Sequence, residues 1–175
     1  MLAARPRADD ISRVPLVPLF GHDALRRRLA DSASRSALPA SLLIEGRRGI
    51  GKQRLALWLG QLLLCSGEGE RPCGTCVNCR YSAELVHPDL RWFFPRPRQS
   101  NADPAAQEIL EDQAEAVRAR AADFGLYAPP SGSDAIFVAT VRALVQFAVY
   151  SASVAKRKVI IVGDAGRVVP QEGGD

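Results

Sequence analysis

The sequence lacks the long apolar segments that membrane insertion or secretion requires. No apolar run approaches the roughly 18 residues that a membrane-spanning helix needs. The opening residues MLAARPRADD also lack the apolar core of a signal peptide. No internal repeat is present. We therefore expect a cytoplasmic protein without a membrane partner.

The chain also has little net charge. Its 23 basic and 19 acidic residues leave a formal charge of +4, with modest arginine clusters at 26–28 and at Arg91, Arg96 and Arg98. This balance permits contact with nucleic acid without requiring it, and a solvated surface is the simpler interpretation. The length of 175 residues indicates one domain, and 47% hydrophobic with 24% charged residues is typical of a soluble protein with a core.

Cysteine is scarce, but the four cysteines lie close together. The stretch CSGEGERPCGTCVNC places Cys65, Cys73, Cys76 and Cys79 in a C-x7-C-x2-C-x2-C pattern. Disulfides do not persist in a reducing cytoplasm, whereas a C-x2-C pair lets two thiolates reach one tetrahedral metal from a tight turn, for which Gly74 supplies backbone freedom. Four thiolates leave no position for water. The pattern predicts a structural zinc module over 65–79, with free or redox-active thiols as the alternative.

The stretch GRRGIGKQ has the spacing of a phosphate-binding loop. Its characteristic residues are Gly46, Gly49, Gly51 and Lys52. The preceding apolar segment, residues 41–46, is predicted as a short buried strand, and residues 52–65 are predicted as an amphipathic helix. Between a strand and a helix, loop amides and the helix N-terminus bind phosphate oxygens, and the lysine reaches the outer phosphates.

Two groups that efficient ATP hydrolysis needs are missing. Gln53 replaces the hydroxyl residue that ligates Mg²⁺, and its longer neutral amide suits an octahedral site poorly. The stretch VIIVGDAG supplies Asp164 where an acidic residue would hold the metal, but Ala165 follows where ATPases of the AAA+ kind carry the glutamate that activates water. We therefore expect hydrolysis to suffer more than binding, with ATP and Mg²⁺ bound weakly at most.

The remaining pattern alternates helices and strands, which indicates an α/β protein. A helix is predicted over 23–35 with Asp23 as its cap, and another by 142–149. Residues 89–95 and 157–166 are predicted strands, the second being of the buried parallel type that ends at a ligand-binding edge. The aromatic residues of the first strand are expected in the core rather than on a base-stacking platform. They are Trp92, Phe93 and Phe94.

Residues 98–134 are predicted to form an insertion on the domain surface that carries no chemistry. Within it, an alanine-rich helix is expected to begin with Asp103 as its cap and Pro104 as its first residue.

Three motifs in one order resemble a known family. They are GHDALRRRLADSASRSALPASLLIEGRRGIGK with the cysteine cluster soon after it, HPDL at 87–90, and KVIIVGDAGRVVPQEG. Their order and spacing are similar to those of the delta-prime subunits of bacterial DNA polymerase III clamp loaders, over residues 17–97 and 136–172. The resemblance implies a P-loop NTPase fold of the AAA+ type, in which helices flank a three-layer parallel sheet and a four-cysteine zinc-binding module is inserted.

The resemblance also implies roles for individual residues. The nucleotide-binding positions fall on Gly46, Gly49, Gly51, Lys52 and Gln53, with Asp164 as the second acidic motif. The zinc ligands fall on Cys65, Cys73, Cys76 and Cys79. His22 and His87 fall at a helix start and before a strand, so both are expected to be structural, and no catalytic residue is expected.

Delta-prime is typically the clamp-loader member that has lost ATPase function. The resemblance therefore implies a non-catalytic subunit that helps load the sliding clamp onto primed DNA during replication, with gamma/tau and delta subunits as partners. One alternative is an active ATPase of the gamma/tau type, which Gln53 and Ala165 argue against. The other is a zinc-ribbon nucleic-acid-binding protein whose glycine loop is coincidental.

The resemblance finally predicts how the chain is divided. Residues 1–16 are expected to form an N-terminal tail, and residues 17–175 a partial AAA+ domain whose 98–134 insertion is longer than the family suggests. The family continues through a sensor strand, a Ser-Arg-Cys arginine-finger motif, a lid and a collar, so the sequence looks like an amino-terminal fragment or a truncated reading frame. Without those elements, we expect an uncovered sheet edge and no stable assembly with other loader subunits.

Overall fold

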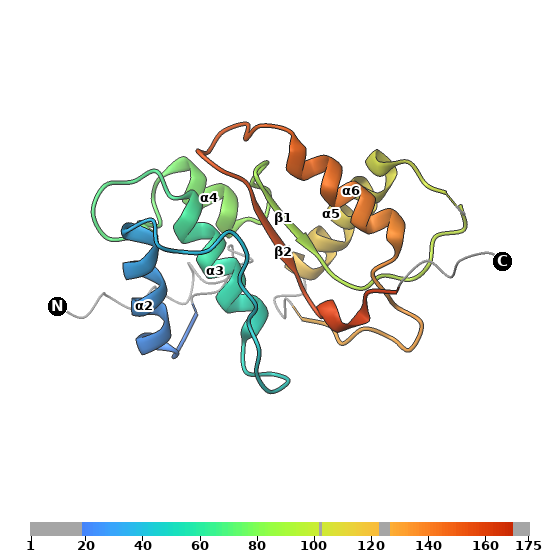
Figure 1. Cartoon of the computed structure of the whole chain (residues 1–175), viewed down its shortest axis with the longest axis horizontal. Coiled ribbons are helices and arrows are strands. Elements are labelled where there is room, and N and C mark those ends of the chain that lie inside the picture. The colour runs from blue at the N-terminus through green and yellow to red at the C-terminus, as the bar shows by residue number, and fades with distance from the viewer. Residues whose placement is uncertain (1–18, 102, 123–126, 170–175) are drawn as a thin grey trace.

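Helices and strands alternate along the chain in the computed structural model, which describes residues 19–101, 103–122 and 127–169. The predicted tail at 1–16 lies outside the described residues. The elements are α2 (Asp23–Ser34), α3 (Lys52–Leu64), α4 (Val77–Ala83), β1 (Leu90–Phe93), α5 (Ala106–Ala122), α6 (Val138–Val149), β2 (Val159–Val162) and the 3₁₀ helix η1 (Ala165–Arg167) (Figure 1).

The two described strands form a small parallel sheet. In its register, Leu90 lies opposite Val159, and Phe93 lies opposite Val162. Parallel neighbours need a long connection between them, and here α5 and α6 provide it. The prediction of strands within 89–95 and 157–166 is confirmed, as is the mixed α/β class.

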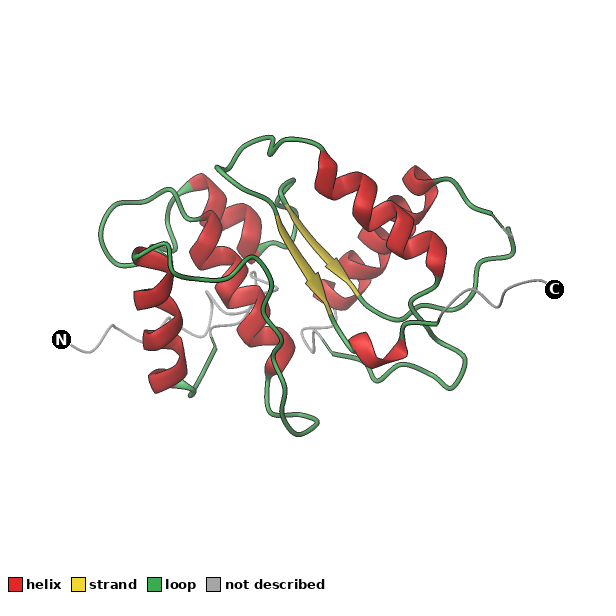
Figure 2. Cartoon of the chain, in the orientation of Figure 1, coloured by secondary structure: helices red, strands yellow, loops and turns green. Residues whose placement is uncertain are grey.

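Helices cover both faces of this sheet (Figures 1 and 2). On one face, Gly60 of α3 approaches β1 so closely that a Cβ atom at this position would lie 2.7 Å from Leu90 Cδ1. On the other face lies α6, where the Arg91 guanidinium is 5.0 Å from the centroid of the Phe147 ring. Helix α2 packs against α3 on the side away from the sheet. The close approach at Gly60 explains why α3 carries a glycine in its interior despite the cost to helix stability.

The core lies between α3, the sheet and α5. The three aromatic side chains Trp92, Phe93 and Phe94 are at most 2% exposed, so their prediction as core residues is confirmed. The main cluster consists of Leu57, Leu64, Leu90, Trp92, Phe94, Ala116, Val117 and Ile161.

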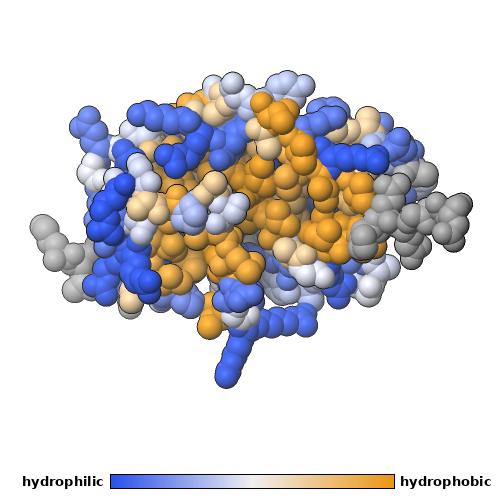
Figure 3. Space-filling model, in the orientation of Figure 1, coloured by the Kyte–Doolittle hydropathy of each residue, from blue (hydrophilic) through white to orange (hydrophobic). Residues whose placement is uncertain are grey.

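The predicted buried strand over residues 41–46 is not formed, so this prediction is wrong. The segment has no strand assignment, and Leu42 and Leu43 are 46% and 78% exposed. A strand requires a hydrogen-bonding partner, and the two strands that the structure describes pair only with each other. Other apolar side chains, including Val145 and Val149 of α6, are also exposed. Figure 3 shows apolar surface across the centre of the face in view.

Two helices begin differently from their predictions, and the expected capping carboxylates form exposed ion pairs instead. His22 rather than Asp23 occupies the N-cap of α2, with a φ of 56° and no side-chain cap. The Asp23 carboxylate lies 3.6 Å from the Arg26 guanidinium. Helix α5 begins at Ala106 instead of at residue 104, and the carboxylate of the expected cap, Asp103, pairs with Arg142 of α6 at 3.3 Å.

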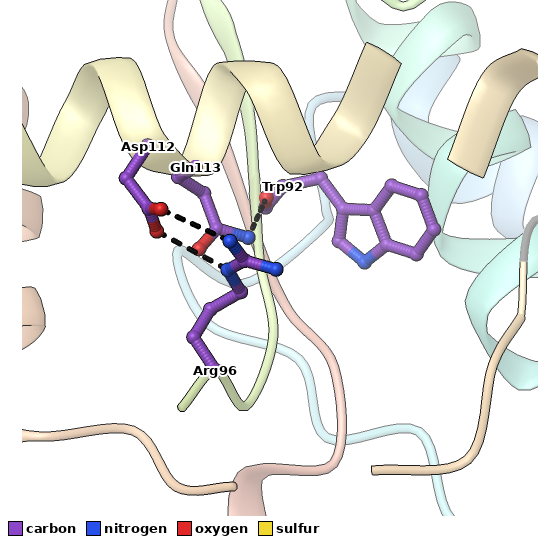
Figure 4. Close-up of polar contacts among 4 residues, drawn as sticks. All are labelled: Trp92, Arg96, Asp112 and Gln113. Atoms are coloured by element: carbon purple, nitrogen blue, oxygen red, sulfur yellow. Dashed lines mark hydrogen bonds and ion pairs between the residues drawn. The ribbon is translucent and has the colours of Figure 1, made fainter. Parts of the chain in front are cut away.

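Helix α5 lies within the segment expected on the surface, yet its inner face contributes to the main core cluster. Polar contacts also fix it to the end of β1 (Figure 4). The Arg96 guanidinium donates two hydrogen bonds to Asp112 of α5, at 3.1 and 2.9 Å. Gln113 of the same helix donates from Nε2 to the Trp92 carbonyl at 3.1 Å. The expected surface segment therefore supplies part of the core.

Among the residues that the structure describes, no helix combines the length and the apolar character needed to cross a membrane.

Candidate functional site

The six residues predicted to bind nucleotide all line one pocket of about 670 Å³. They are Gly46, Gly49, Gly51, Lys52, Gln53 and Asp164. The first five belong to the glycine loop (residues 46–51) and the start of α3, whereas Asp164 directly follows Gly163 at the end of β2. The fold thus joins two segments that are 111 residues apart in the chain.

The backbone of the glycine loop requires its glycines. Gly46, Gly49 and Gly51 have φ values of 152°, 83° and 94°, a region that L side chains rarely adopt. Gly51 is the N-cap of α3 and offers no side-chain cap, so the first amides of the helix remain available to an anion. The Lys52 ammonium donates to the carbonyls of Gly46 and Arg47 at 2.8 and 2.9 Å.

A direct contact joins Gln53 and Asp164 across the pocket. The amide Nε2 of Gln53 donates to Asp164 Oδ2 at 3.1 Å. The Oε1 atom of the same amide is buried and has no hydrogen-bond partner. Gly163 lies against this amide, because a Cβ atom built at that position would be only 2.9 to 3.0 Å from its three terminal atoms. Gln53, one of the two positions that depart from an ATP-hydrolysing pattern, therefore contacts the carboxylate of the residue directly before the other, Ala165.

Positive charge dominates the lining of the pocket. Asp164 is its one acidic side chain among the described residues, and the basic ones are Arg48, Lys52, Arg54 and Arg167. Burial lowers the pKa of the nearby Arg120, an effect that the negative charge of Asp164 opposes. This charge distribution favours an anionic ligand.

Sequence reasoning missed the part of the pocket that comes from the 98–134 segment. Tyr127 and Pro130 line it, although the segment was expected to carry no chemistry. Arg167 holds this segment in place by donating to the Ser131 and Asp134 carbonyls at 2.7 and 3.2 Å. Neither hydrophobic periodicity nor a motif marks Tyr127. The structure brings Tyr127 to the pocket through the fold of its segment, which Arg167 contacts at Ser131 and Asp134.

The four cysteines form a second candidate site at the opposite end of α3. Cys65 is the C-cap of α3, Cys76 is the N-cap of α4, and Cys79 lies in the first turn of α4. All four Sγ atoms, including that of Cys73, lie within 4.8 Å of one another. They are therefore close enough to hold a metal ion.

The spacing of the sulfur atoms fits a tetrahedral ion. The Sγ atoms of Cys65 and Cys76 are 3.9 Å apart, and those of Cys73 and Cys79 are 4.0 Å apart. Zinc–sulfur bonds of about 2.3 Å give tetrahedral edges of about 3.8 Å. A disulfide would require about 2.05 Å, and all four cysteines are free.

Backbone amides around the cluster favour the thiolate form that binds metals. The amides of Cys73, Cys76 and Cys79 each donate to the sulfur of the preceding cysteine at 3.4 Å. Gly74 has a φ of 75°, which allows the turn. Although burial opposes the shift, hydrogen bonds from Ser66 and Cys79 lower the pKa of the Cys76 thiol to about 5. Burial raises the pKa of the Cys79 thiol.

The HPDL motif connects the cysteine cluster to the sheet. His87 is fully buried, its Nε2 donates to Asn78 Oδ1 of α4 at 3.2 Å, and its Nδ1 accepts from the Asp89 amide at 3.0 Å. The other histidine, His22, contacts the Ile50 carbonyl of the glycine loop at 2.9 Å. Both histidine side chains thus form polar contacts between separate segments of the fold.

Together these features define an α/β protein in which one helix begins at a basic glycine-loop pocket and ends at a cluster of four cysteines. A family model described as "DNA polymerase III, delta subunit" matches residues 21–172. The chain belongs to this family, as its resemblance to delta-prime subunits predicted.

Two curated relatives are similar to part of the chain. DNA polymerase III subunit delta' of Bacillus subtilis is 36% identical over 67 residues, which cover 38% of this chain and 20% of the relative. The protein of the same name from Haemophilus influenzae is 33% identical over 55 residues, which cover 31% of this chain and 17% of the relative. In each case the match spans only about a fifth of the length of the relative.

Proposed function

We propose that this chain belongs to a non-catalytic, delta-prime-type subunit of the DNA polymerase III clamp loader, which helps place the sliding clamp on primed DNA. The family match over residues 21–172 carries this proposal. The proposed partners are the gamma/tau and delta subunits, and the complex contacts the clamp and the DNA. Its proposed location is the cytoplasm. In domain terms, residues 17–175 would form a partial AAA+ module with 98–134 as its insertion.

We also propose that Cys65, Cys73, Cys76 and Cys79 hold one structural zinc ion. The sulfur spacing and the amide hydrogen bonds support this choice, since they suit a closed tetrahedral thiolate shell. The ion would tie the end of α3 to the short helix α4. Because four thiolates leave no open coordination position, its role would be mechanical rather than catalytic.

The glycine-loop pocket is proposed to bind nucleotide without efficient hydrolysis. The loop geometry and the basic lining support binding. Gln53 takes the place of the hydroxyl that ligates Mg²⁺, and Ala165 takes the place of the carboxylate that activates water. Neither side chain offers the chemistry that hydrolysis requires.

Reconstitution of the loader tests the proposed role. Residues 1–175 alone are not expected to co-elute with the gamma/tau and delta subunits on size exclusion, whereas a chain extended through the sensor strand, arginine-finger motif, lid and collar of the family is. The extended chain is also expected to raise the clamp- and DNA-dependent ATPase rate of these subunits, because loader modules act by rearranging together. The control is the same mixture without this protein. An unchanged elution profile and an unchanged ATPase rate with the extended chain would show that the proposed role is wrong.

ATP turnover provides a separate prediction. The unmodified protein is expected to hydrolyse ATP slowly or not at all, and Gln53→Thr alone is not expected to create a motor because Ala165 still cannot activate water. Lys52→Ala should weaken ATP binding at least about tenfold, whereas Lys156→Ala, an exposed lysine outside the pocket lining, should not. Calorimetric titration measures binding, and phosphate release measures turnover. Robust turnover by the unmodified protein would favour an active ATPase.

A further inference from the structure

The contact between Gln53 and Asp164 occupies the place where a glycine-loop site normally holds Mg²⁺. We propose that Gln53 closes this cation position, so that the pocket binds the polyphosphate of a nucleoside triphosphate without a divalent cation. The inference rests on the proposed binding of nucleotide by the glycine loop. It goes further by naming the Gln53 amide as the group that takes the place of Mg²⁺.

The direction of the hydrogen bond between Gln53 and Asp164 supports the proposal that the Mg²⁺ position is closed. A magnesium ion needs oxygen ligands at about 2.0–2.1 Å, but the Gln53 amide presents an N–H group to the carboxylate. An ionised carboxylate only accepts hydrogen bonds, so the opposite orientation would place two acceptor oxygens against each other. The chain retains the observed orientation even though it leaves Gln53 Oε1 buried without a partner. The bond to Asp164 therefore determines how the amide is turned.

Packing keeps the Gln53 amide beside the carboxylate. Its terminal atoms lie against Gly163 at a distance that leaves no room for a Cβ atom there. Asp164 itself has a φ of 49°, which fixes the direction of its backbone directly after β2. An entering cation would have to break the hydrogen bond between Gln53 and Asp164 and displace an amide that packs against Gly163.

The charge of the pocket makes a cation unnecessary. In a magnesium-dependent site, the metal offsets the repulsion between the acidic side chain and the phosphates. Here four basic side chains share the lining with Asp164, and the Asp164 carboxylate already receives a hydrogen bond. The phosphate charge is therefore opposed by the protein itself, and a free Mg²⁺ ion would meet a repulsive field.

The inference predicts the sign of the magnesium effect. Mg²⁺ reduces the negative charge of ATP. A cationic pocket without a metal site should therefore bind Mg-ATP no more tightly than free ATP. A site that uses the metal should show the opposite order. We would titrate ATP into the zinc-loaded full chain by calorimetry, once in a magnesium buffer and once in a magnesium-free buffer. Potassium chloride would equalise the ionic strength.

A substitution at position 53 provides the sharper comparison. Gln53→Thr restores a hydroxyl and removes the hydrogen bond to Asp164, so Mg²⁺ should now tighten ATP binding by about tenfold. The matched control is Gln146→Thr, which makes the same chemical change at an exposed position of α6 and should respond to Mg²⁺ like the unmodified protein. If Gln53 only supported the local structure, Gln53→Thr would bind ATP more weakly by the same factor with and without magnesium.

Three results would overturn the inference. They are a large tightening of unmodified-protein binding by Mg²⁺, an equal response of the unmodified protein and Gln53→Thr to Mg²⁺, and an absence of ATP binding by both proteins in both buffers. The last result would also reject nucleotide binding by the pocket. It would leave the proposed clamp-loader role intact, because reconstitution tests that role independently.

Discussion

Replacing Cys76 with serine is expected to remove most of the bound zinc and to lower the melting temperature by about 10 °C or more. The unmodified protein should contain about one zinc ion per chain, because four sulfur atoms with tetrahedral spacing form a closed shell. A serine hydroxyl cannot supply the missing thiolate. Helix α4 has only seven residues, so it depends on tertiary contacts rather than on its own propensity. Metal analysis and thermal denaturation provide the two measurements.

Chelation serves as the control for this substitution. Removing zinc from the unmodified protein should reproduce the lower melting temperature of Cys76→Ser, and adding zinc back should restore the unmodified protein but not the variant. Protein purified gently without any metal, and with the same melting temperature as a zinc-supplemented sample, would contradict a structural zinc ion.

Local spacing made the cysteine cluster and the glycine loop predictable. Cys73, Cys76 and Cys79 lie within seven residues of sequence, and the turn through Gly74 brings their sulfur atoms together without help from distant segments. The positive φ values of the glycine loop likewise depend on residues that the sequence shows directly. In both cases the motif specifies its own backbone.

The wrong or missing predictions concern contacts between distant segments. Residues 41–46 have the apolar character of a strand, but a strand also needs a neighbour, which the pattern does not supply. The alanine-rich sequence of α5 predicts a surface helix, but its small side chains allow the helix to pack closely against the core. The Gln53–Asp164 bond spans 111 residues. The sequence shows that Gln53 replaces a hydroxyl residue, but it does not reveal Asp164 as the hydrogen-bond partner of the amide.

Removing the buried carboxylate of Asp89 should produce the second large effect. Its Oδ1 accepts from the Ser153 amide at 2.6 Å, and its Oδ2 accepts from the Val154 and Ala155 amides at 2.8 and 2.7 Å. Asp89 is fully buried and thus holds the connection between α6 and β2. Asp89→Ala should lower the free energy of unfolding by about 3–5 kcal/mol, since three amides lose a charged acceptor. Urea denaturation measures the change. Asp31→Ala, at an exposed position of α2, should change it by less than about 0.5 kcal/mol.

The same carboxylate should make stability depend on acidic pH. Although burial opposes the shift, the three amides lower the pKa of Asp89 in the folded protein. Its stabilisation is therefore complete above the unfolded pKa of about 3.9 and is lost as the pH falls through the lower folded pKa. Asp89→Asn should lack this contribution, so its stability deficit relative to the unmodified protein should shrink as the pH falls below about 4. Acid would also remove a metal ion from the cysteine cluster, which the unmodified protein and Asp89→Asn share. Burial in addition lowers the pKa of His87 in the unmodified protein. The informative quantity is therefore the difference between the unfolding free energies of the unmodified protein and Asp89→Asn. A deficit that stayed constant from neutral pH to pH values below the folded pKa would show that the ionised carboxylate does not hold this connection.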